Sequence, residues 1–403
     1  MLLLSVLQIL SLPLRCMRAF AFASLLLLTL ASGPAVAGQI NSPFPRPTEL
    51  QQGPPLTNQE YVALLYQLPK HPEERDRLID QIRKRGIGFQ LTPGLLSLTA
   101  TKSGNDTLLR HTLEEANRRR INPALAVRPS LAEAAELLER SRKATLGAAE
   151  RMPDFLVKQQ ITRSQAYGQT RNWSVYDRLS IAVSYRQGQG EDYKLLAVNG
   201  VPAVDQSYGI NLGGTVSAGE YVTVLSDLFK PETRAEFEMV DTALTRGRRT
   251  VVYEYLVKKE FSRQGLGWGE RGVMLKQTIV GLRGRIWVDI ENNRVLRLES
   301  IATEIEPGFP ITADSKVIDY DWVSINDQRH LLPSRALVEL TARAGSVNEQ
   351  TRNDILFRGY RKFGTEVKIT DIDETDFPAD PPEDEPKRPE TAPVLKPPPI
   401  KKP

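Results

Sequence analysis

The feature that most constrains this chain is an alternation of apolar and polar residues with a period of two, which recurs between residues 155 and 363. The stretches "LSIAVSYR" (179–186) and "VVYEYLVKKE" (251–260) show it most clearly. Such a period predicts β-strands with one buried face and one exposed face. We expect about ten strands of this kind, with the amphipathic segment 219–231 as a helix among them.

The stretch "GRIWVDIENNRVLRLES", residues 284–300, predicts how these strands are joined. Strand-forming residues flank Asn292 and Asn293, and asparagine tolerates the positive φ that a tight hairpin turn requires. Short connections of this type favour antiparallel neighbours. The predicted fold is therefore α+β: a curved antiparallel half-barrel sheet with covering helices, preceded by a small all-α module.

Helix signals surround the alternating region. "TNQE" at residue 57 and "SLAE" at residue 130 are capping boxes, in which Ser or Thr begins a helix and Glu three positions later returns a hydrogen bond. Thr92 followed by Pro93 is a further helix start. Composition then divides the chain beyond its leader into a Pro-rich linker (38–56), a small helical module (57–122), the half-barrel (130–370) and a disordered Pro-rich tail (371–403).

The amino terminus has the pattern of a secretory signal peptide. The apolar run "AFAFASLLLLTL" follows two arginines and precedes small residues, so we expect residues 1–37 to be removed by cleavage between Ala37 and Gly38. The run is shorter than the roughly 20 residues that span a bilayer, so no transmembrane segment is expected in the mature chain. The predicted location is the periplasm or the outside of the cell.

Charge and cysteine content exclude several classes of function. The 53 basic and 49 acidic residues include Arg15 and Arg18 of the leader, so the mature chain has a formal charge near +2 and no nucleic-acid partner is expected. The single cysteine, Cys16, also lies in the leader. Disulfides, thiolate metal sites and cysteine catalysis are therefore excluded for the mature chain, and we expect no metal and no cofactor.

Several segments resemble a known group. A leading helix that ends in "MPDF", the long antiparallel region and the hairpin of residues 284–300 resemble the LolA-like periplasmic lipoprotein carriers and outer-membrane lipoprotein-sorting proteins. "EDYKLLAVNG", "FPITADSKVIDYDWVSI" and "RHLLPSRALVEL" are similar to recurrent pieces of large exported bacterial proteins. The resemblance implies a curved sheet of about eleven strands whose concave, apolar face receives acyl chains.

The alternation itself selects a candidate apolar face for a hydrophobic ligand such as a lipid or acyl chain. Its proposed lid is formed by Leu225, Leu228 and Phe229 of the internal helix. The same side chains would equally form an ordinary packed core, and an unfilled cavity distinguishes the two cases. The candidate ligand-binding residues are Leu179, Ile181, Val183, Tyr253, Tyr255, Val257, Leu296, Leu298, Ile318, Tyr320 and Trp322.

Signs of catalysis are sparse, and we predict a protein that is not an enzyme. Asp319 and Asp321 share one face of a strand about 7 Å apart, a spacing compatible with glycoside hydrolysis or calcium binding, but solvated acids opposite Arg or Lys are the simpler interpretation. The three histidines His71, His111 and His330 have no metal-ligand spacing. The glycine-rich stretches 209–214 and 265–272 lack the lysine of a phosphate-binding loop and are expected to be loops.

Three functions therefore stay open. The first is the binding or carrying of a hydrophobic ligand. The second is a cell-envelope interaction module with a filled scaffold core, which contacts a protein partner. The third is a secreted hydrolase, which would require Asp319 and Asp321 to point into a cleft with a third polar group.

Overall fold

The computed structural model describes residues 2–4 and 53–378, with short gaps at 105, 124–126, 169–170, 205–206, 210–211, 218, 220, 271–272, 345–346 and 365–367. All described residues belong to one compact unit. The predicted cleavage site at Ala37 and Gly38, nearly all of the predicted linker before residue 53, and the tail beyond residue 378 lie outside the described residues.

The amino-terminal helical module contains α1 (Asn58–Gln67), α2 (Glu74–Arg85), α3 (Pro93–Ser103) and α4 (Thr107–Ile121). The capping box at Thr57 and Glu60 is formed, and Thr92 caps α3 as predicted. Asp106 caps α4 by accepting from the Leu109 amide. These helices enclose an apolar core of their own, which includes Tyr61, Leu65, Leu78, Ile79, Ile82, Leu109 and Leu113.

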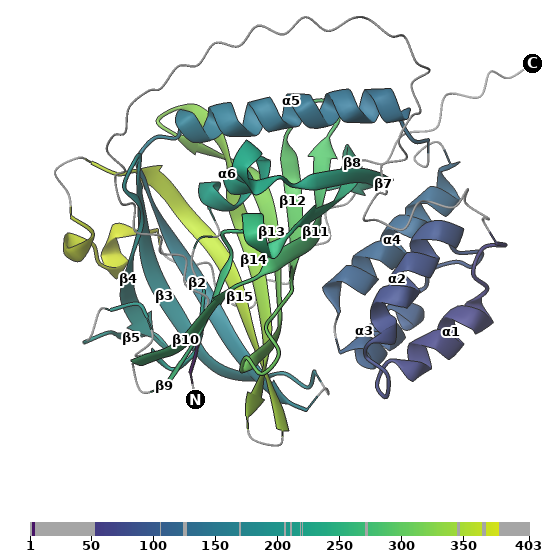
Figure 1. Ribbon diagram of the computed structural model, residues 1–403, viewed down its shortest axis with the longest axis horizontal. Helices are drawn as coiled ribbons and strands as arrows, with labels where there is room; N and C mark the ends of the chain where they lie inside the picture. Colours follow the sequence, from purple (N-terminus) through teal and green to yellow (C-terminus); the bar gives the residue numbers. More distant parts are fainter. Residues whose placement is uncertain are drawn as a thin grey trace, which may run out of the picture. The chain divides into compact units, whose positions relative to one another are not determined.

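The large sheet has eleven strands in the order β5-β4-β3-β2-β15-β14-β13-β12-β11-β8-β7, and every neighbouring pair is antiparallel. Its two edges do not pair with each other, so the sheet is an open half-barrel, as predicted (Figure 1). The strands are β2 (Phe155–Tyr167), β3 (Ser174–Arg186), β4 (Gly190–Val198), β5 (Val201–Pro202), β7 (Glu236–Thr245), β8 (Arg248–Val257), β11 (Gly281–Asp289), β12 (Val295–Thr303), β13 (Ile311–Ile325), β14 (Gln328–Ala344) and β15 (Val347–Lys362).

The hairpin predicted from residues 284–300 is formed by β11 and β12. Asn293 has a φ of 53°, the left-handed value for which asparagine is suited. Near the start of this hairpin, Gly284 pairs with Tyr255 of β8. The Tyr255 hydroxyl donates to the Glu299 carbonyl at 3.0 Å, on the far side of β11. A side chain at Gly284 would obstruct that hydrogen bond, which explains the glycine.

Two helices cover the concave side of the sheet. The helix α5 (Leu131–Glu150) begins at the predicted capping box of Ser130 and Glu133 and lies across the strands in Figure 1. The shorter α6 (Val222–Phe229) lies within the curve of the sheet. Both helices contribute to one buried cluster with the strands, so this face is the main core of the molecule.

A second, smaller sheet corrects the prediction of a loop at residues 265–272. Strand β9 (Gly265–Glu270) pairs with β10 (Val273–Ile279), in a sheet of order β10-β9-β1-β6 with β6 (Gly214–Val216) and β1 (Leu2–Leu4). Leu266 and Trp268 alternate inward into a separate buried cluster. The positions between these two residues and beside them are glycines instead of polar residues, so the segment resembles a loop in the sequence. Strand β1 lies within the predicted leader.

The packed chain also continues beyond residue 370, where the predicted tail begins. Two short 3-10 helices, Ile369–Asp371 and Glu374–Asp376, follow the last strand. Ile372 and Phe377 are buried against Leu156, Ala182 and Leu196 on the outer side of β2 to β4. Lys194 donates to the carbonyl of Thr370 at 2.7 Å, so this segment is held by polar contacts as well.

Candidate apolar binding site beneath helix α6

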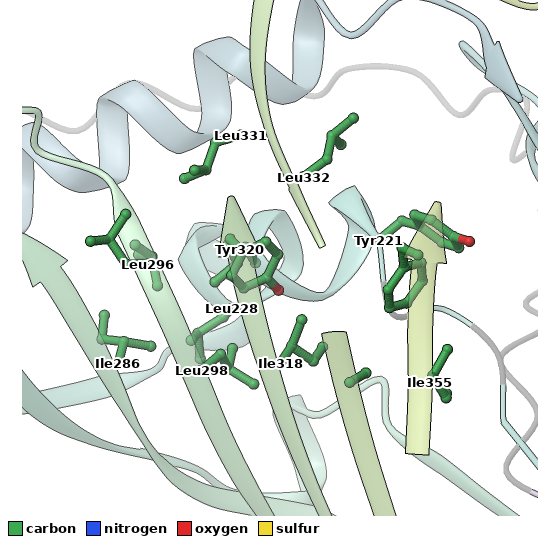
Figure 2. Close-up of a cluster of buried hydrophobic side chains, with 14 of the residues drawn as sticks. Tyr221, Leu228, Ile286, Leu296, Leu298, Ile318, Tyr320, Leu331, Leu332 and Ile355 are labelled. Carbon is green, nitrogen blue, oxygen red and sulfur yellow. The ribbon is translucent and has the colours of Figure 1, made fainter. Parts of the chain in front are cut away.

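The structure brings the predicted apolar face together. Leu179, Ile181 and Val183 of β3 lie in the same cluster as the candidate residues of β8, β12 and β13. All of these are buried, while Trp322 is partly buried and packs against the cluster. Figure 2 shows Leu296, Leu298, Ile318 and Tyr320 on the side of the sheet that faces α6. The predicted lid residues Leu225, Leu228 and Phe229 are buried on α6.

Further residues complete this face beyond those named from the sequence. Ile286 of β11 and Ile355 of β15 lie among the candidate side chains (Figure 2). Phe155 stacks on Tyr185 with ring centroids 5.2 Å apart, and Tyr221 meets Phe357 edge-to-face at 5.1 Å. Extending the two-residue alternation to β11, β14 and β15 would have identified Ile286 and Ile355. Nothing in the local pattern predicts Tyr221, which precedes α6.

Directional polar contacts hold α5 in place. The Tyr253 hydroxyl donates to the Ala134 carbonyl at 2.7 Å. Arg294, in the β11–β12 turn, donates to the Ala144 carbonyl at 3.0 Å, and Arg140 donates to Asn293 at 3.0 Å. Burial raises the pKa of Tyr253 above its ordinary value, so its hydroxyl stays a neutral donor. The helix α5 is therefore a fixed cover for the sheet.

Helix α6 is attached in a different way. Among the described contacts, Ser226 donates to the Thr223 carbonyl at 3.0 Å and Lys230 pairs with Asp227 at 2.5 Å, both within the helix and its end. Arg263 approaches Asp227 at 3.9 Å from a loop. No described polar contact of residues 223–229 reaches a strand of the large sheet. At the N-cap of α6, Gln159 of β2 donates to the Tyr221 hydroxyl at 3.0 Å. Over the rest of the helix, apolar packing holds α6 on the sheet, and such packing is non-directional.

Small cavities border α6 on both sides. One, of about 30 Å³, lies between α5, α6 and the strand residues Tyr320 and Leu332. The other, of about 60 Å³, lies between Leu228 and the strand residues Tyr255 and Leu298. Neither can hold an acyl chain, because ligand pockets are typically about 300–1,000 Å³. In this conformation the concave face is a filled core with packing defects beside α6.

The competing catalytic sites do not assemble. Asp319 pairs with Arg297 at 3.2 Å and with Arg246 at 3.4 Å on the outer face, as the simpler interpretation predicted. Asp321 is exposed and accepts from the backbone amide of Trp322. Burial, with a contribution from Arg294, lowers the pKa of His330. Within the described ranges, no group of three His, Cys, Asp or Glu residues could hold a metal ion, and none of the helices is long and apolar enough to cross a membrane.

The fold defines an α+β half-barrel class of protein. No family model matches the chain, and no curated protein matches it. A DUF1329 family protein from Desulfovibrio piger is 11% identical, with a TM-score of 0.25, over 59% of this chain and 98% of that one. A putative outer membrane lipoprotein-sorting protein domain from Vibrio parahaemolyticus is 11% identical, with a TM-score of 0.25, over 58% of this chain and 94% of that one.

A third solved structure, of MucB in complex with MucA(peri), is 10% identical, with a TM-score of 0.16, over 54% of this chain and 93% of that one. The lipoprotein-sorting group expected from the sequence thus recurs among the solved structures that match. Since these TM-scores are far below 0.5, we base the functional inference on the residues of this chain.

Proposed function

We propose that this protein reversibly binds a long apolar chain, such as the acyl chain of a lipid, between α6 and the concave face of the sheet. The observation that carries the proposal is the difference in attachment between the two covering helices. Polar contacts fix α5 near both of its ends, whereas residues 223–229 of α6 meet the sheet through apolar side chains, and the described polar contact of α6 with the sheet lies at its N-cap, Tyr221. An apolar ligand can replace the apolar contacts without leaving a buried polar group unpaired.

The free energy lost when α6 leaves the sheet sets a minimum length for the ligand that replaces it. Lifting α6 would expose Leu225, Leu228 and Phe229, at about 1.5–3 kcal/mol each, or on the order of 5–9 kcal/mol in total. A chain that buries about fourteen methylene groups gains about 11 kcal/mol, which exceeds that cost. A chain of eight carbons gains only about 6 kcal/mol. We therefore expect a threshold length near ten to twelve carbons, below which binding is weak.

The test is a series of saturated fatty acids from eight to eighteen carbons, titrated by displacement of a fluorescent fatty acid from the mature chain, residues 38–403. We expect binding to begin at about ten to twelve carbons in the native protein. Leu228→Ala lowers the cost of lifting α6 and enlarges the adjacent cavity, so it should bind more tightly and shift the threshold to shorter chains. Leu228→Asp should abolish binding because it places a charge in the apolar site.

The matched control is Leu275→Ala, at a leucine that is 55% exposed on β10. It should bind as the native protein does. Circular dichroism must show that each variant is folded. If neither the native protein nor Leu228→Ala binds any chain length, the proposal is wrong.

Export is part of this proposal. The predicted leader would place the protein in the periplasm or outside the cell, where lipids and lipoproteins offer acyl chains. Binding would be non-covalent and would need no metal or cofactor. Native mass spectrometry of the protein purified from a periplasmic fraction without detergent would show whether a lipid accompanies it.

A second function is favoured by one specific observation: the concave face is filled in this structure, with cavities of about 30 and 60 Å³ beside α6. A filled half-barrel would act as a scaffold, and the protein would then contact a protein partner of the cell envelope through its appended parts. Absence of all fatty-acid binding, together with a lipid-free mass, would favour this function over the first.

A further inference from the structure

A cavity much larger than those beside α6 lies on the other side of the sheet. Its volume is about 730 Å³, and it lies between α2 and α4 of the helical module and the outer faces of β7, β8 and β11 to β14. Trp287 and Val252 are among the apolar residues that the sheet contributes to its lining. Unlike the concave face, this cavity is large enough for a small-molecule ligand.

The cavity lining is rich in guanidinium groups. Six arginines line it, from both the helices and the sheet, against five carboxylates. The arginines are Arg83, Arg118, Arg119, Arg246, Arg297 and Arg335. The imidazole of His111 also lines the cavity.

The carboxylates of the lining already have partners. Glu114 accepts from Arg110 at 3.0 Å, and Glu115 accepts from the Leu244 amide at 3.0 Å. The others are engaged by arginines of the same cavity: Asp241 by Arg119 at 3.0 Å, Glu299 by Arg297 at 3.0 Å, and Asp319 by Arg297 at 3.2 Å. The negative charge of the lining is therefore committed to existing contacts. Ion pairs also engage the lining arginines other than Arg83.

Two arginine donors are not satisfied. Nη1 of Arg83, on α2, and Nε of Arg119, on α4, are buried and have no hydrogen-bond partner among the described residues. A buried N–H of a charged group without an acceptor is costly, so a shift of either side chain that brings its donor to a ligand oxygen in the cavity would stabilise the folded protein. Guanidinium groups match the oxygen atoms of phosphate and carboxylate.

We infer that this cavity binds a small anionic molecule that carries a phosphate or carboxylate group, with Arg83 and Arg119 as its donors. The site is separate from the apolar site beneath α6 and does not depend on it. Because the lining comes from both the helical module and the sheet, a bound anion also stabilises the contact between them.

The experiment is isothermal titration calorimetry of the mature chain at low salt with three probes: inorganic phosphate, citrate and dihexanoyl phosphatidate. Saturable binding of the first or second indicates a free anion as the source, and preference for the third indicates a lipid headgroup. Arg83→Gln should weaken binding about tenfold or more, and Arg83→Lys should restore part of it. We choose Arg83 because Arg119 also pairs with Asp241, so its loss could disturb the fold.

The matched control is Arg120→Gln, at an exposed arginine on α4 that donates to Asn117 at 3.2 Å. It should change the affinity less than twofold. Hydrogen exchange should slow in α4 when the anion is bound to the native protein but not to Arg83→Gln. Equal weakening by Arg83→Gln and Arg120→Gln would indicate diffuse surface attraction and overturn the inference, as would the absence of binding to all three probes.

Discussion

The two faces of the large sheet are built from alternate residues of the same strands, yet different forces hold them. On the inner face, Ile318 and Tyr320 pack into an apolar core beneath α5 and α6. On the outer face, Asp319 between them pairs with Arg297. The inner face therefore depends on volume and shape, which salt and pH leave unchanged, whereas the outer face depends on charge.

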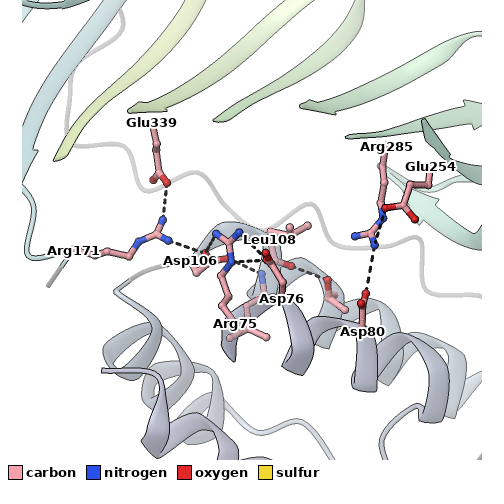
Figure 3. Close-up of polar contacts among 11 residues, drawn as sticks. Arg75, Asp76, Asp80, Asp106, Leu108, Arg171, Glu254, Arg285 and Glu339 are labelled. Atoms are coloured by element: carbon pink, nitrogen blue, oxygen red, sulfur yellow. Dashed lines mark hydrogen bonds and ion pairs between the residues drawn. The ribbon is translucent and has the colours of Figure 1, made fainter. Parts of the chain in front are cut away.

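The outer face also carries the contact with the helical module. Arg171 lies between Asp106 of the module, at 3.3 Å, and Glu339 of β14, at 2.6 Å (Figure 3). Arg285 of β11 approaches Asp80 of α2 at 3.4 Å. Acids and bases alternate across this contact, so its strength should vary with pH while the inner core does not. Substitutions on each face can test this difference.

The largest effect is expected on the inner face, from Gly284→Ala. A Cβ at this position would overlap the Glu299 carbonyl and lie 2.6 Å from the Tyr255 hydroxyl. The strands cannot move apart without losing their hydrogen bonds, so we expect a loss of at least about 3 kcal/mol in the free energy of unfolding. Urea denaturation would measure it. Gly94→Ala in α3, where a Cβ meets nothing within 4 Å, is the control and should be neutral or slightly stabilising.

A smaller effect is expected from the buried charges of the outer face. Arg297 is 8% exposed and bonds to both Glu299 and Asp319. Arg297→Met leaves two carboxylates without their main partner and should cost about 3 kcal/mol. Adding Glu299→Gln removes one of those charges and should recover part of the loss. A double variant no more stable than Arg297→Met alone would show that packing, rather than charge, dominates this face.

The smallest loss of stability is expected from Asp106→Asn, at the contact between the helical module and the outer face of the sheet. Burial alone would raise the pKa of Asp106, but Arg75 and Arg171 outweigh it and hold the pKa below its ordinary value. A carboxyl with a lowered folded-state pKa stabilises the fold above its unfolded pKa of about 3.9, and this stability is lost as the pH falls through the folded-state pKa. Asparagine keeps the helix cap but removes the charge, at about 1–2 kcal/mol at neutral pH.

Hydrogen exchange in α4, followed from pH 7 to pH 3, measures this loss. In the native protein we expect α4 to exchange faster at acid pH while β12 and β13 do not change. In Asp106→Asn the difference between neutral and acid pH should be smaller. A pH dependence that is identical in the two proteins would exclude Asp106 as its source.

Much of the fold could be predicted from local patterns. The capping boxes at Thr57 and Ser130, the turn at Asn293 and the side of the sheet on which Tyr255 lies are as expected, because each depends on residues a few positions apart. Strand β9 was missed because its glycines conceal the alternation. The packing of Phe377 on the outer side of β2 to β4 was missed because its partners are far away in the sequence.

By itself, the sequence determined most of the strands and helices, though not β9, and the apolar face of the strands with clear alternation, since periodicity and capping are local properties. Only the tertiary structure decided how much space remains between these elements. It placed small cavities beside α6 and a large one between α4 and the outer face of the sheet. The physical reason is that the volume of a cavity depends on how closely side chains from distant segments of the chain approach one another. The periodicity within one segment carries no information about its distance from another segment.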